Sequence, residues 1–60
     1  MTERVGTIEA YLGFTERNEG NNEAARKHFE RAKIMGDEQH LPHVSVMAVN
    51  GLGSLAADEG

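Results

Sequence analysis

The residues that could do chemistry are few, and they gather in one short segment of the chain. His40 and His43 are three residues apart and follow Asp37 and Glu38. Imidazole nitrogens and carboxylate oxygens are ligands that zinc and related metals accept in proteins. The two histidines flank Pro42 at an expected helix start, where a fixed ligand geometry is not assured, so a solvated loop is the simpler interpretation. A metal-binding helical protein that uses His40 and His43 is kept as an alternative.

The other polar residues show no catalytic pattern. The chain has no cysteine, which excludes thiol nucleophiles and cysteine-type zinc sites and leaves the redox compartment open. It has no nucleophile elbow, phosphate loop or HExxH motif. The carboxylates of Glu16 and Glu19 fall on an expected helix surface, where solvation is the expected state, and acid catalysis would require a burial that the sequence does not predict. We therefore expect a protein that is not an enzyme and uses no cofactor.

The charge balance argues against nucleic acid as a partner. Ten acidic and six basic residues give a net charge of -4, and no run of five like charges occurs. A surface that binds phosphates would need clustered lysines and arginines. The longest apolar stretch, around residues 44–49, is too short to span a bilayer, and the polar first residues lead into no secretory signal. We expect a soluble, cytoplasmic protein with no membrane partner.

Helical periodicity dominates the chain, and no useful strand-like alternation occurs. We predict one all-α domain over residues 1–60, with helices at about 2–19, 22–35 and 42–58. Gly20 and Gly36 are expected to end the first two helices, and Pro42 suits the first turn of the third. Each helix carries apolar residues at spacings of three and four. The side chains expected to fill the space between the helices are Leu12, Phe29, Met35, Val49 and Leu52.

The first helix of this scheme also carries Val5 and Ile8 in line with Leu12, which predicts its packing face. The third helix contains Gly51 and Gly53 in its interior. Each of these glycines costs about 1 kcal/mol of helix stability relative to alanine. The close approach of another helix is the simplest reason for them.

The first and third helices share a sequence repeat. Leu12-Gly13 followed by Asn18-Glu19-Gly20 matches Leu52-Gly53 followed by Asp58-Glu59-Gly60, at a constant offset of forty residues. A fixed period in this range is typical of helical solenoids, in which each helix packs on its neighbours.

These residues resemble the tetratricopeptide repeat, in a forty-residue variant. Leu12-Gly13 takes the place of the Leu-Gly pair of its motif, and Ala25 and Phe29 take the place of its Ala-x3-Phe. The match is partial, because Glu9, Glu16 and Asp37 stand where the motif has Trp, Tyr and Pro. The resemblance covers about one and a half repeats. It implies an antiparallel helical hairpin plus a third helix, which another chain would complete.

The resemblance implies a function in protein–protein interaction or oligomerisation. Its groove would bind a protein or peptide through Ala10, Phe14, Arg17, Asn18, Met47, Asn50 and Ser54. The third helix carries a broad apolar stripe that the second helix of its own repeat would be expected to cover. Without that helix, the stripe predicts a homo-oligomer interface at Val46, Val49, Leu52, Leu55 and Ala56. A second alternative is that the chain is a fragment of a larger signalling or transcription regulator containing such repeats.

Overall fold

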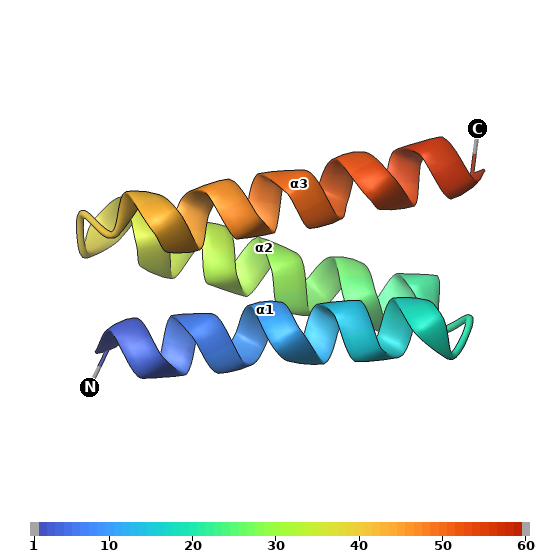
Figure 1. The fold of residues 1–60 in the computed structure, drawn as a ribbon, viewed down its shortest axis with the longest axis horizontal. Coiled ribbons are helices and arrows are strands. Elements are labelled where there is room, and N and C mark those ends of the chain that lie inside the picture. Colours follow the sequence, from blue (N-terminus) through green and yellow to red (C-terminus); the bar gives the residue numbers. More distant parts are fainter. Residues whose placement is uncertain (1, 60) are drawn as a thin grey trace.

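The chain folds into three α-helices in the computed structural model, which describes residues 2–59 and the side chains from residue 4 onward. The helices are α1 (Thr2–Asn18), α2 (Asn22–Glu38) and α3 (Pro42–Glu59). α1 and α3 run in the same direction, and α2 runs against both and packs on each of them (Figure 1). The prediction of an all-α hairpin with a third helix is confirmed. None of the three described helices combines the length and hydropathy needed to cross a bilayer.

The first turn forms as predicted around Gly20. Its backbone φ of 86° lies in the left-handed region, which glycine adopts without steric cost. The N–H of Asn21 then donates to the carbonyl of Glu16 at 2.8 Å, which satisfies an open group at the end of α1. Asn21 occupies the N-cap of α2, although its side chain makes no capping hydrogen bond.

The prediction that Gly36 ends the second helix is wrong. α2 continues to Glu38, and His40 takes the left-handed conformation with φ of 56°. Gly36 is buried instead, and a Cβ at this position would lie only 2.7 Å from the backbone nitrogen of Ser45. The glycine therefore lets the start of α3 pass close to α2, and the chain turns after the helix has continued beyond it.

The core consists of two small clusters along the axis of α2. Ala10, Ala32, Val44 and Ala48 form the first, and Ala25, Phe29 and Leu55 form the second. Phe29 is fully buried, and its ring packs edge-on against Phe14 with centroids 4.8 Å apart. A Cβ at Gly13 would lie 2.7 Å from this ring, and one at Gly51 would overlap it. Phe29 therefore fills a space that two glycines, one on α1 and one on α3, leave open.

The packing face of α1 differs from the predicted one. Val5, Ile8 and Leu12 are all at least two-fifths exposed, whereas Gly6, Ala10 and Gly13 are buried. Val49 of α3 is half exposed as well. The prediction that Leu12 and Val49 belong to the core is therefore wrong. Small residues let the helices approach, and side chains from the facing helices fill the space between them.

Candidate functional site

The groove predicted between the first and third helices is partly closed by the chain itself. Ala10 is fully buried, so the prediction that it contacts a partner is wrong. Phe14 is half-buried against Phe29, and Met47 packs against the first core cluster. Arg17 Nε donates to Asp58 Oδ2 at 2.9 Å, which joins α1 to α3. Asn18 and Asn50 remain exposed, and Ser54 is half-buried.

The predicted oligomer interface divides into a buried and an exposed part. Leu55 is only 1% exposed, because it packs against Phe29 and Ala25, so its assignment to an interface is wrong. Leu52 is half-buried against the same cluster. The exposed part is a line along one side of the helix that we term the open face of α3, formed by Val46, Val49, Gly53 and Ala56. Spacings of three and four residues place these four on the same side.

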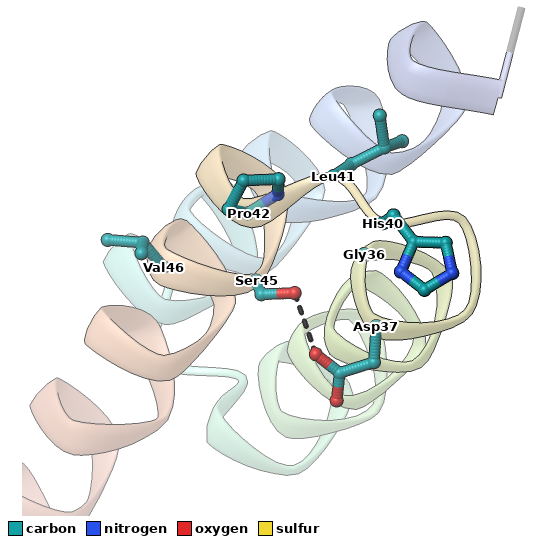
Figure 2. Close-up of a pocket in the computed structure, with 7 residues that line it drawn as sticks. All are labelled: Gly36, Asp37, His40, Leu41, Pro42, Ser45 and Val46. Atoms are coloured by element: carbon teal, nitrogen blue, oxygen red, sulfur yellow. Dashed lines mark hydrogen bonds between the residues drawn. The ribbon is translucent and has the colours of Figure 1, made fainter.

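A pocket of about 590 Å³ opens where α2 passes into α3, next to this face. It is lined by Gly36, Asp37, His40, Leu41, Pro42, Ser45 and Val46 (Figure 2). Val46 belongs to both surfaces, so the pocket continues into the open face. Sequence reasoning did not predict a pocket here, because Gly36 was expected to end the helix and its close approach to Ser45 is a tertiary contact.

The polar chemistry of the pocket centres on Asp37. Ser45 Oγ donates to Asp37 Oδ1 at 2.8 Å (Figure 2), and Lys33 Nζ donates to Asp37 Oδ2 at 2.9 Å. These two hydrogen bonds, the one from Lys33 first, lower the pKa of Asp37. In a Ser-His-Asp triad the histidine stands between the other two groups. Here the carboxylate binds the serine directly, so the pocket does not present Ser45 as an activated nucleophile.

The histidines considered as metal ligands do not form a ligand cluster. His40 lies at the rim of the pocket, and His43 lies in the first turn of α3. Within residues 2–59, no three side chains of the types His, Asp and Glu come together in a way that could hold a metal ion. The geometry gives the metal-binding alternative no support.

The contacts of Asp37 predict a specific pH dependence. Because its pKa is lowered in the fold from 3.8, the stability from its hydrogen bonds is complete above that pH and is lost as the pH falls through the folded-state pKa. We expect the stability difference between the wild type and Asp37→Asn to shrink on acidification, measured by urea unfolding from about pH 6 to about pH 2. Glu38→Gln, an exposed neighbour, is the control. A difference that stays constant with pH would contradict the assignment.

The part of the chain that the structure describes therefore presents an apolar helix face, a mostly apolar pocket that adjoins it and a partly closed groove. No family model, curated protein or solved structure matches this chain. The resemblance to the tetratricopeptide repeat stays a prediction from the residues.

Proposed function

We propose that this chain is a non-catalytic protein–protein interaction and oligomerisation module of the tetratricopeptide type, which binds helices, including those of a second copy, through exposed apolar faces. The observation that carries the proposal is the open face of α3, where Val46 and Val49 are 56% and 50% exposed. Burial of apolar surface yields about 25 cal/mol per Å². A partner helix that covered this face would gain that free energy, and contiguous apolar surface of this kind is typical of binding sites.

The opposite outer helix supports the same function. α1 exposes Val5, Ile8 and Leu12, which also lie along one helix face. A chain of sixty residues buries only about 60% of the surface that its unfolded form exposes. A partner that binds only the folded state therefore adds stability that this small core lacks.

A second candidate is that these helices belong to a longer helical array in a signalling or transcription regulator. The observation in its favour is that both outer helices, α1 and α3, expose apolar faces. In that case the two faces contact further helices of the same protein. The cytoplasmic location stays a prediction under either candidate.

The function is tested by the double variant Val46→Glu/Val49→Glu. A second copy is the one partner always present in a pure sample, so we expect the molar mass of the wild type in sedimentation equilibrium to rise with concentration. The double variant should stay monomeric with an unchanged circular dichroism spectrum, because both side chains are at least half exposed. Ile34→Glu, at a similarly exposed site on α2, should associate like the wild type. A wild type that stays monomeric at every concentration would contradict the proposal.

A further inference from the structure

Gly53 has no packing role in the three-helix fold. A Cβ at Gly51, two residues earlier, would overlap the ring of Phe29. A Cβ at Gly53 would meet no atom within 4 Å. A glycine inside a helix costs about 1 kcal/mol relative to alanine. The described contacts therefore explain Gly51 and leave the cost of Gly53 without a compensating contact.

The forty-residue repeat relates this open glycine to one that is covered. The residues of α3's open face stand forty positions after residues of α1 that face the other helices: Val46 after Gly6, Val49 after Glu9 and Gly53 after Gly13. In α1, Gly13 receives the ring of Phe29, and Glu9 Oε2 lies 3.1 Å from His28 Nδ1. Gly6 faces Val44 of α3, whereas Glu9 and Gly13 face α2. At Val49 and Gly53, the side that α3 leaves open is thus the side with which α1 contacts α2.

We infer that the open face of α3 binds, from another protein, an α-helix with the residue pattern of α2. Its central residue is a large aromatic or apolar side chain that lies over Gly53 as Phe29 lies over Gly13. Small residues stand about one turn to either side, as Ala25 and Ala32 flank Phe29. The helix runs antiparallel to α3, as α2 runs against α1. This inference rests on the proposed function and names the kind of partner.

The charges on α3 specify where the partner differs from α2. Glu9 of α1, which pairs with His28 of α2, is replaced by Val49 in α3. No charged residue occurs between positions 46 and 57. A histidine at the His28 position would therefore lie against a valine without an ionic partner, which is unfavourable for a polar group. The partner helix carries an apolar residue at that place.

A peptide with the sequence of residues 21–39 of this chain, labelled with a fluorophore, tests the inference. Binding to the full sixty-residue chain is followed by fluorescence anisotropy. We expect the His28→Leu peptide to bind more tightly than the unmodified peptide. Phe29→Ala in the peptide should weaken binding about tenfold or more, because a buried aromatic anchor is removed. The inference would be overturned if the peptide does not bind, or if neither His28→Leu nor Phe29→Ala in the peptide changes its affinity.

Variants of the chain locate the binding face. Gly53→Leu fills the open space, so it should leave the fold intact and weaken peptide binding about tenfold or more through overpacking. Gly53→Ala is the smaller change, which keeps the test valid if leucine disturbs folding. Thr15→Leu, an exposed site on α1, should bind like the wild type. Binding that survives Gly53→Leu would show that the peptide displaces α2, and this would overturn the inference.

The peptide experiment and the self-association experiment can fail independently of each other. If the wild type self-associates through Val46 and Val49 while the peptide fails to bind, the partner assignment is wrong and the interaction function stands. If the inference is right, an excess of the His28→Leu peptide should also lower the molar mass of wild-type assemblies, because peptide and second copy compete for the same face.

Discussion

Phe29→Ala should leave this chain largely unfolded in dilute solution at room temperature. Phe29 is fully buried in the second core cluster, with Gly13 and Gly51 against its ring. Truncation of a buried phenylalanine to alanine costs about 3–5 kcal/mol. A core of this size rarely supplies more than about 3–5 kcal/mol in total. The expected result is a loss of most of the helical signal in far-ultraviolet circular dichroism.

A matched aromatic on the surface separates this effect from a general loss of hydrophobicity. Tyr11 is 63% exposed on α1, so Tyr11→Ala should retain the wild-type spectrum and melt within a few degrees of the wild type. A cooperative transition of Phe29→Ala at the wild-type temperature would show that Phe29 does not hold the three helices together.

The helices and the packing face of α2 could be predicted from the sequence because their signals are local. Ala25, Phe29 and Ala32 recur at helical spacing among charged residues, and all three are buried. Gly20 was correctly predicted to end a helix, whereas the same prediction for Gly36 was wrong. In sequence both are glycines at the end of an amphipathic segment. The difference is that Ser45 of α3 passes close to Gly36, which is a tertiary contact and leaves no local signal.

The packing face of α1 could not be predicted from hydrophobicity. The pattern of Val5, Ile8 and Leu12 is the more apolar one, yet the buried line contains Gly6, Ala10 and Gly13. Small residues contribute little to a hydrophobic pattern, but they let a facing helix approach. In this interface the volume comes from Val44 and Phe29 on the other helices. The choice between two faces of one helix therefore depends on what the other helices present.

The interface residues on α3 show the same dependence. Of the five residues predicted as an interface, Val46, Val49 and Ala56 are exposed, Leu52 is half-buried and Leu55 is buried. Neighbouring positions in a helix differ by about 100° in direction, so a broad stripe includes both buried and exposed sides. The position of α2 relative to α3 decides which residues of the stripe are buried and which are exposed.

Gly51→Leu and Gly53→Leu should change stability in opposite directions, although they make the same substitution two residues apart in one helix. Both gain about 1 kcal/mol of helix propensity, so that contribution cancels between them. At Gly51 the new side chain would overlap the ring of Phe29, whereas at Gly53 it would meet open space. Overpacking of a core typically costs about 1–3 kcal/mol and more where the neighbours cannot move. We expect Gly51→Leu to melt far below the wild type and Gly53→Leu to melt above it.

Thermal melting followed by circular dichroism, at a concentration where the chain is monomeric, measures the difference. A ΔΔG of 1 kcal/mol shifts the melting temperature of a 60–100-residue domain by about 4–8 °C, so the pair should be well resolved. Equal melting temperatures would mean that Phe29 can move away from Gly51, and that close approach of α3 to α2 is not what this glycine provides. A large separation would show that two glycines of one helix serve different neighbours. Gly51 would be required by the ring of Phe29, and Gly53 by no contact within the three helices.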